Sequence, residues 1–213
     1  MKKIFTYDKY NFSLWNVNTS IIYNDERAKN KILSVLPMDD YTFINSNVVL
    51  FNISVKRYLE LNEFKMNLIP FFDLTPILNE NISSLDLSSI IYLKVIVSLL
   101  NNDGIIVFDD VLSYLEENKK RIVIDYLKKN DITFINITSD TEEILLADYL
   151  IVLTNSGVAI EGKTNTVLNE DKLLRRLGFS LPFLFDISLK LKSYDISNKI
   201  YSNIDGLVNE LWK

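Results

Sequence analysis

The 213-residue chain contains neither cysteine nor histidine. The absence of cysteine excludes disulfides, thiolate nucleophiles and sulfur-ligated metal sites, and the absence of histidine removes the most common general base and transition-metal ligand. Glycine (5 residues) and proline (4) are also scarce, so the chain has few residues for the glycine-rich loops that bind phosphate groups. Any chemistry must therefore use carboxylate, lysine, hydroxyl and backbone groups.

Long hydrophobic runs and positive charge are lacking as well. The longest apolar run, residues 90–100, is interrupted by Lys94, whereas a membrane-spanning helix needs about 20 apolar residues. The first residues have no apolar stretch after their lysines, so no signal peptide is expected. The net charge of −5 disfavours broad binding to nucleic acid. The sequence therefore predicts a cytoplasmic protein that does not bind nucleic acid.

What the chain does contain is enough apolar sequence for a core. Hydrophobic residues make up 48% of it, and its length favours one domain, with two small ones as the alternative. Residues 105–108 form a continuous apolar run that ends at Asp109, which is typical of a strand buried on both faces of a parallel sheet.

Helices and strands alternate around this run. Helices are expected at residues 28–36, 55–61, 63–71, 88–100, 116–129 and 142–147, and strands at 19–23, 41–44, 132–137, 149–153 and 158–161. Ser88 and Ser89 are suited to capping the helix that they begin. From Thr166 onward the pattern predicts small helices. The alternation predicts an α/β fold with a mainly parallel sheet flanked by helices.

Several short motifs of the second half occur in a known order. Leu85-Asp86-Leu87-Ser88-Ser89 stands where a Leu-Ser-Gly-Gly-Gln signature would begin a helix, 24 positions before a strand that ends in Asp109-Asp110. Ser139-Asp140, Glu142-Glu143 and Leu146-Ala147-Asp148 follow in the expected register. In this order the segment 85–191 resembles the nucleotide-binding subunit of ABC transporters, and most of all the energy-coupling-factor or cobalt-type branch.

The resemblance implies a P-loop NTPase-like fold with a reduced antiparallel subdomain. It divides the chain into an ABC ATPase-like domain at residues 1–165, with a helical insertion at about 55–88, and a C-terminal helical extension at 166–213. It also implies ATP and Mg²⁺ as ligands. The site residues carried over are Lys29 and Asn30 at the end of the Walker A loop, Ser88 and Ser89 in the signature, Asp109 as the Mg²⁺ ligand, and Asp110 and Ser139 at the positions of the catalytic glutamate and the switch histidine.

Lys29 and Asp109 match the family pattern, whereas the elements around them depart from it. The stretch before Lys29 has no glycine and carries Asp25 and Glu26, where the family uses glycines to bring backbone amides to the phosphates. A glutamine is missing near residues 44–46, the signature is altered, and Ser139 cannot carry the positive charge of a histidine. Asp110 is one methylene shorter than glutamate, and such a misplacement can cost about a hundredfold in rate. Binding of ATP and Mg²⁺ is therefore expected to be weak or absent.

Three functional readings remain open. The first is a degenerate subunit that serves as a structural or regulatory partner of a transporter, with little or no hydrolysis, at the inner face of the cell membrane. Its partners would be a sister ATPase subunit, a multi-spanning membrane protein, or both, held through the nucleotide face or a groove near residues 47–58. The second is a divergent but active ATPase that uses Lys29, Asp109 and Asp110. The third is an α/β protein unrelated to transport.

Overall fold

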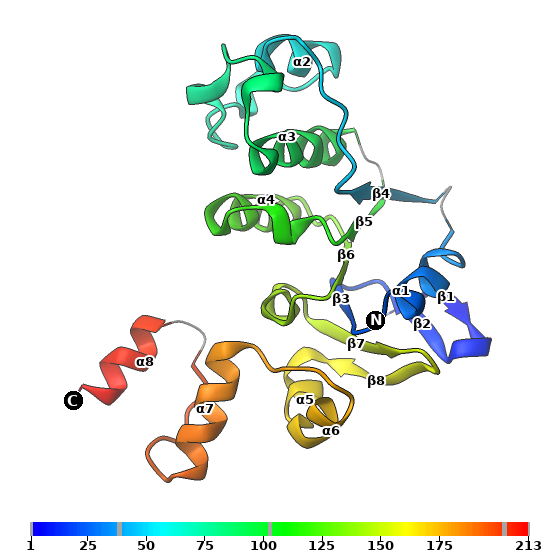
Figure 1. The fold of residues 1–213 in the computed structure, drawn as a ribbon, viewed down its shortest axis with the longest axis vertical. Coiled ribbons are helices and arrows are strands. Elements are labelled where there is room, and N and C mark those ends of the chain that lie inside the picture. Colours follow the sequence, from blue (N-terminus) through cyan, green and yellow to red (C-terminus); the bar gives the residue numbers. More distant parts are fainter. Residues whose placement is uncertain (1, 38–39, 102–103, 202–203, 213) are drawn as a thin grey trace.

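The computed structural model describes residues 2–37, 40–101, 104–201 and 204–212. Its centre is a six-stranded sheet with the strand order β4-β5-β6-β3-β7-β8 (Figure 1). The strands are β3 (Thr19–Tyr23), β4 (Tyr41–Asn45), β5 (Ile105–Asp109), β6 (Phe134–Thr138), β7 (Tyr149–Thr154) and β8 (Gly157–Lys163). Neighbours from β4 to β7 pair in parallel, and β8 turns back antiparallel to β7.

Both faces of this sheet are covered, which explains the continuous apolar run of β5. Ile106 and Phe108 share one hydrophobic core with the helices on one side, whereas Val107 packs in a second core with Ala28 and Ile32. In Figure 1, α3 and α4 lie on one side of the sheet and α1 on the other. The helices are α1 (Glu26–Leu33), α2 (Val55–Leu61), α3 (Leu87–Leu100), α4 (Glu117–Lys129), α5 (Thr164–Leu168), α6 (Asp171–Arg176), α7 (Phe183–Ser193) and α8 (Ile204–Leu211).

The α/β fold predicted from the sequence is confirmed, and with it the mainly parallel sheet. The strand expected at residues 19–23 and the helix at 55–61 have the observed bounds, and the other expected strands differ at their ends by up to two residues. The segment at 142–147 is a 3₁₀ helix at Thr141–Leu146. The division at residue 165 stays a prediction.

Three local expectations are wrong. Residues 63–71 form a 3₁₀ turn at Met66–Leu68 rather than a helix, because Phe64 and Phe72 turn inward and stack with ring centroids 6.0 Å apart. The helix expected at 28–36 begins earlier and ends at Leu33. Helix α3 is not capped by its serines, since the Asp86 side chain accepts from the Ser89 amide at 2.7 Å.

The reduced antiparallel subdomain implied by the resemblance is present as a hairpin, although the sequence did not place its strands. Strands β1 (Lys3–Tyr7) and β2 (Phe12–Trp15) pair beside the main sheet and cover the α1 side of the core with Phe12 and Leu14. Asn11 makes the reversal in the left-handed conformation, with φ of 51°. This pair forms the small antiparallel subdomain of the fold. Among the described residues, no helix combines the length and hydrophobicity that crossing a membrane requires.

Candidate functional site

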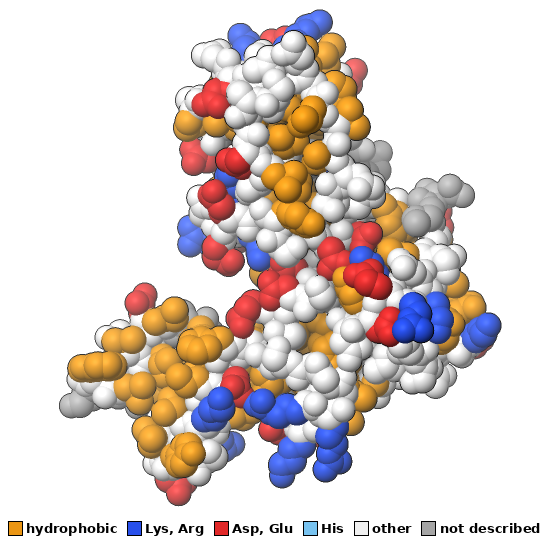
Figure 2. Space-filling view, in the orientation of Figure 1, with side chains coloured by type: hydrophobic (Ala, Val, Ile, Leu, Met, Phe, Trp, Pro, Cys, Tyr) orange, Lys and Arg blue, Asp and Glu red, His pale blue; other side chains and the backbone are white. Residues whose placement is uncertain are grey.

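The candidate site lies where the carboxyl ends of the parallel strands meet. Because β3, β4, β5 and β6 run in the same direction, the residues that follow them gather at one edge of the sheet. There they surround an open depression of about 400 Å³. It is lined by Tyr23, Glu26, Lys29, Asn45, Ser46, Asn47, Asp109, Asp110, Ser113, Tyr114 and Ser139. Figure 2 shows Asp and Glu side chains gathered near the middle of this face.

Three carboxylates surround the ammonium group of Lys29. Its Nζ lies 2.8 Å from Asp110 Oδ2, 3.0 Å from Glu26 Oε2 and 3.5 Å from Asp109 Oδ1. Burial alone would lower the pKa of Lys29, but the hydrogen bonds to Asp110 and Glu26 outweigh it and raise the pKa above its ordinary value. The ammonium is therefore fully charged and already neutralised by groups of the chain itself.

Tyr23 completes this network at the end of β3. Its hydroxyl donates to Asp110 Oδ2 and lies 3.1 Å from Glu26 Oε1, and Lys29 Nζ sits 5.2 Å from the centre of its ring. Burial, followed by the hydrogen bond to Asp110, raises the pKa of the phenol. The other oxygen of Asp110 accepts from the Ser139 amide at 3.2 Å. Both oxygens of Asp110 are therefore occupied by internal donors.

Asp109 is the least satisfied member of the cluster. Its Oδ1 is buried and makes no hydrogen bond, although Lys29 Nζ is 3.5 Å away. Burial raises the pKa of Asp109, while the charge of Lys29 acts in the opposite direction. The main interaction that stabilises the Asp109 carboxylate is therefore the ion pair with Lys29.

The connection from β3 to α1 is short and internally bonded. Only Asn24 and Asp25 separate the two elements. The carboxylate of Asp25 caps α1 by accepting from the Arg27 amide at 2.8 Å, and it also accepts from the Asn155 side chain. The Asn24 side chain donates to the carbonyl of Leu177 at 2.6 Å. The amino end of α1, where an anionic ligand could bind, is therefore already occupied by the carboxylate of Asp25.

These residues do not fit MgATP. A phosphate cradle needs free backbone amides and an available cation, but here Asp25 takes up the start of α1 and Lys29 is held by carboxylates. Within the described residues, no group of three or more His, Cys, Asp and Glu has an arrangement that could hold a metal ion. In this structure the cation and the helix start that a phosphate cradle would use are engaged by carboxylates of the chain itself.

The structure brings together four of the seven site residues expected from the sequence, namely Lys29, Asp109, Asp110 and Ser139. Asn30 is exposed on α1 outside the depression. Ser88 and Ser89 lie at the start of α3, also outside it, where the Ser89 hydroxyl contacts Asp86 and Lys119. The structure therefore does not bring Asn30, Ser88 and Ser89 together with the other four, and their role in a site stays a prediction.

Tyr23, which lines the depression, was not singled out from the sequence, and neither was the role of Lys94, which lies outside the depression but contacts the segment at its border. Tyr23 ends an apolar strand and therefore looked like part of the core. Lys94 was noted only as an interruption of an apolar helix, but its ammonium donates to the carbonyl and side-chain oxygens of Asn45, both at 2.8 Å, and to the carbonyl of Asn47 at 2.7 Å. A single charged residue in such a run was the available signal for this contact.

The segment held by Lys94 joins the depression to a second hollow. Asn47 lines both the depression and an apolar groove of about 230 Å³ between the 47–51 segment, α2 and α3. At its rim Val49 is 70% exposed, Leu50 61% and Phe51 44%. The apolar patch expected near residues 47–58 is therefore present at the surface, and it adjoins the candidate site.

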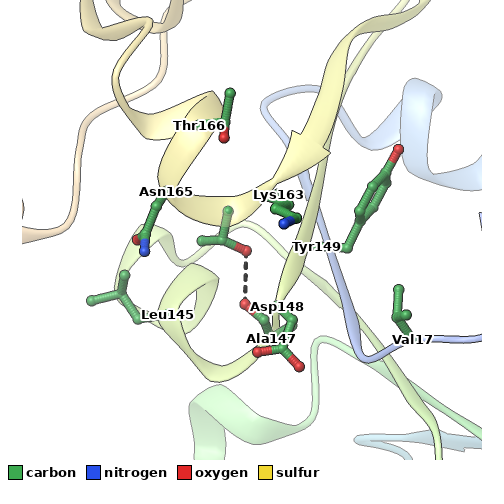
Figure 3. A pocket seen from close by; sticks show the side chains of 9 residues that line it. Val17, Leu145, Ala147, Asp148, Tyr149, Lys163, Asn165 and Thr166 are labelled. Atoms are coloured by element: carbon green, nitrogen blue, oxygen red, sulfur yellow. Dashed lines mark hydrogen bonds between the residues drawn. The ribbon is translucent and has the colours of Figure 1, made fainter. Parts of the chain in front are cut away.

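A third hollow, of about 480 Å³, lies at the opposite edge of the sheet. Figure 3 shows Tyr149 and Lys163 around it. The Thr164 hydroxyl donates to the carbonyl of Ala147 at 2.7 Å. Its charged lining residues, Asp148 and Lys163, are exposed. Because this edge holds the amino ends of the parallel strands, the hollow is separate from the candidate site.

The similar proteins of known sequence reported below are ATP-binding proteins of energy-coupling factor transporters. No protein-family model matches the chain. The chain is 32% identical over 116 residues to the energy-coupling factor transporter ATP-binding protein EcfA1 of Mesomycoplasma hyopneumoniae, which covers 53% of the chain and 41% of that protein. It is 27% identical over 174 residues to EcfA1 of Mycoplasmopsis pulmonis, covering 80% of the chain and 63% of that protein. The chain thus matches between two fifths and two thirds of the length of these relatives.

Solved structures agree on the fold. The structure of cbiO1 from Clostridium perfringens, described as part of the ABC transporter complex cbiONQ, superposes with a TM-score of 0.65 at 13% identity, over 86% of this chain and 89% of that one. The ADP conformation of MJ1267, an ATP-binding cassette of an ABC transporter, gives 0.59 at 16% identity, over 75% and 87%. The chain therefore has the fold of an ABC ATPase domain, and its sequence is similar to parts of the ATP-binding proteins of energy-coupling factor transporters.

Proposed function

We propose that this chain is a nucleotide-binding-type subunit of a membrane transporter that acts as a structural or regulatory partner and hydrolyses little or no ATP. Its ancestry supports the first part of the proposal, since its relatives are transporter ATP-binding proteins. Its site supports the second part. The hydrophobic frame of the fold is complete, whereas the groups that would bind and cleave ATP are changed or engaged elsewhere.

The observation that carries the proposal is the capture of Lys29 by Glu26, Asp109 and Asp110. An incoming triphosphate would have to displace these carboxylates, and it would meet their negative charge at short range. Two unit charges 4 Å apart interact by about 4 kcal/mol at the effective dielectric of a protein surface. Phosphate binding at this edge is therefore opposed by Glu26, which stands where the family has its glycine-rich loop, and by the two aspartates at the carboxyl end of β5.

The groove supplies the partner side of the proposal. Its apolar rim at Val49, Leu50 and Phe51 is exposed in the single chain, and exposed apolar patches of this kind mark interaction sites. We assign it to a helix of the membrane-spanning subunit, which places the chain at the inner face of the membrane. A sister ATPase subunit would meet the face that carries the depression and the start of α3.

A thermal-shift titration with MgATP tests the proposal. Stabilisation by a ligand follows its occupancy of the folded state, and a ligand at 100 times its Kd adds about 2.7 kcal/mol. We expect no upward shift at millimolar MgATP for the wild type, for Lys29→Ala, or for Lys31→Ala, which changes an exposed lysine of the same helix. An upward shift that Lys29→Ala abolishes and Lys31→Ala preserves would show a working nucleotide site and favour the alternative, a divergent but active ATPase that uses Lys29, Asp109 and Asp110; release of phosphate from ATP by the wild type would then establish it.

A further inference from the structure

The hollow at the amino edge of the sheet has no part in the proposed function. It lies between the start of β7 and the passage from β8 to α5, with Val17 at one side. We call it the amino-edge hollow. Its volume of about 480 Å³ exceeds that of the depression and of the groove. Cavities that hold small molecules have volumes of about 300–1,000 Å³, so the amino-edge hollow has the size of a ligand site.

The walls of the hollow are fixed by hydrogen bonds of the backbone. The Thr164 amide donates to the Asp148 carbonyl at 2.9 Å, and the Thr164 hydroxyl donates to the Ala147 carbonyl at 2.7 Å. On the other side, the Tyr149 amide donates to the Asn18 carbonyl at 3.1 Å. A ligand would therefore meet a preformed cavity and would not have to order its walls, which lowers the cost of binding.

Most of the surface inside the hollow is apolar. Ala147, Tyr149 and Thr164 are buried, and Val17 is half-buried. Among the described residues that line it, Leu145 is the only large hydrophobic side chain that is exposed, at 44%. One exposed leucine does not make the apolar patch that marks a protein interface. A concave apolar lining with a few polar groups is instead typical of sites for small molecules.

Two opposite charges stand at this cavity. Lys163 and Asp148 line it, and both side chains are exposed. Figure 3 shows Lys163 and Asp148 on different sides of the cavity, with Tyr149 and Val17 on a third. Within the described part of the chain, neither charged group has an ion-pair or side-chain hydrogen-bond partner. The hollow thus offers one free ammonium and one free carboxylate beside an apolar wall.

These two charges select the class of ligand. An anion would be attracted by Lys163 but repelled by Asp148, and a cation would meet the reverse. A zwitterion satisfies both, and an apolar group on it would match the wall. We propose that the amino-edge hollow binds a free α-amino acid with an apolar side chain. Its carboxylate pairs with Lys163, its ammonium pairs with Asp148, and its side chain packs against Tyr149 and Val17. Because the depression lies at the other edge of the sheet, this site is independent of the proposed function.

Isothermal titration of the full chain with L-phenylalanine tests this site. For a ligand of this size in a preformed cavity we expect a Kd on the order of 0.1–1 mM. Lys163→Gln and Asp148→Asn should each weaken binding about fivefold to tenfold, because each removes one charged contact. Lys172→Gln and Asp125→Asn change exposed residues outside the hollow and should bind as the wild type does. Lys29→Ala should also bind normally, so a failure here is distinct from a failure of the proposed function.

Two analogues of phenylalanine separate the roles of the charges. Hydrocinnamate lacks the ammonium, and phenethylamine lacks the carboxylate, so both should bind the wild type more weakly than phenylalanine. Asp148→Asn should strengthen binding of hydrocinnamate, and Lys163→Gln should strengthen binding of phenethylamine, because each removes a repulsion. Glycine carries both charges without the apolar group and should bind much more weakly than phenylalanine.

The same titrations can overturn the proposal. The four variants replace exposed side chains, so an unchanged Tm should show that they are folded. The proposal fails if phenylalanine gives no binding up to roughly 10 mM, or if Lys163→Gln and Asp148→Asn bind it as the wild type does. Equal affinity of the wild type for hydrocinnamate and phenylalanine would leave a plain anion site, and equal affinity for phenethylamine would leave a cation site. Either result contradicts recognition of a zwitterion.

Discussion

The substitution Lys29→Met tests whether Lys29 stabilises the fold or is kept for phosphate binding. The substitution keeps the length and the apolar stem of the side chain and removes its charge. Asp109 and Asp110 then lose their common cation, and their side chains are only 22% and 23% exposed. Removing one partner of a buried ion pair costs about 3–5 kcal/mol, whereas exposed pairs contribute about 0–1 kcal/mol. For this partly buried cluster we expect a loss of about 2 kcal/mol.

Urea unfolding at pH 7 measures that loss, and calorimetry should show a fall in Tm of roughly 4–8 °C for a chain of this size. Lys31→Met is the matched control, because Lys31 is an exposed lysine of the same helix. Its effect should stay within about 0.5 kcal/mol. A similar small effect of Lys29→Met would refute the conclusion that the carboxylates and Lys29 form a structural network.

The pH dependence gives a second and independent readout. The pKa of Asp109 is raised by burial and held down by Lys29, so Lys29→Met should raise it further. A carboxyl whose pKa is higher in the folded than in the unfolded state favours folding at low pH, and this benefit is lost as the pH rises through the folded value. The deficit of the variant should therefore be smaller at pH 5 than at pH 7. The pKa of Lys29 itself is raised from 10.5, so the deficit should be equal at pH 7 and pH 9. Equal deficits at pH 5 and pH 7 would contradict this account.

Two other substitutions test the frame and the groove. Glu143 is 1% exposed and accepts hydrogen bonds from Lys120 at 3.0 Å and from Asn136 at 2.9 Å. Glu143→Gln should leave the buried Lys120 without its main partner. We expect it to lower the free energy of unfolding, measured in urea, by roughly 3 kcal/mol. Glu117→Gln, at an exposed partner of the same lysine, should cost less than about 0.5 kcal/mol. Leu50→Asp combined with Phe51→Asp should move the chain from the membrane fraction of its host to the supernatant without lowering Tm. Leu61→Asp, at an exposed leucine outside the groove, should leave it with the membranes, and equal behaviour of the two variants would exclude the groove as the docking site.

The sequence predicted those parts of the fold that depend on apolar pattern. The run at residues 105–108 predicted a buried parallel strand, whereas Lys29, Asp109 and Asp110 were brought to one site by the family resemblance. The apolar spacing predicted the wrong structure where tertiary contacts override local preference. Residues 63–71 have helical spacing, but Phe64 and Phe72 are drawn inward, and the Tyr92 hydroxyl donates to the Phe72 carbonyl at 3.0 Å.

The hairpin of β1 and β2 was missed for a different reason. Its strands mix charged, aromatic and polar residues, so neither shows a clear alternation. The usable signal was Asn11 between two short apolar segments, since asparagine tolerates the left-handed conformation that a tight reversal needs. A similar requirement acts on Gly157 at the start of β8, where φ is 119° and a Cβ atom would lie 2.8 Å from the Tyr10 carbonyl oxygen. Contacts of this kind join segments nearly 150 positions apart, which no local pattern reveals.

The electrostatics of the depression were the least predictable feature, and they decide its chemistry. The sequence placed a lysine at the expected position and two acids before it, but their effect depends on which oxygen reaches which nitrogen. In the structure one ammonium faces three carboxylates, and Asp110 adopts the left-handed backbone conformation, with φ of 50°, that lets it meet both Tyr23 and the Ser139 amide. The summed charge at this edge is negative even with Lys29 fully protonated. A polyphosphate responds to that sum rather than to the lysine alone, which is why the preserved lysine is weak support for nucleotide binding in this chain.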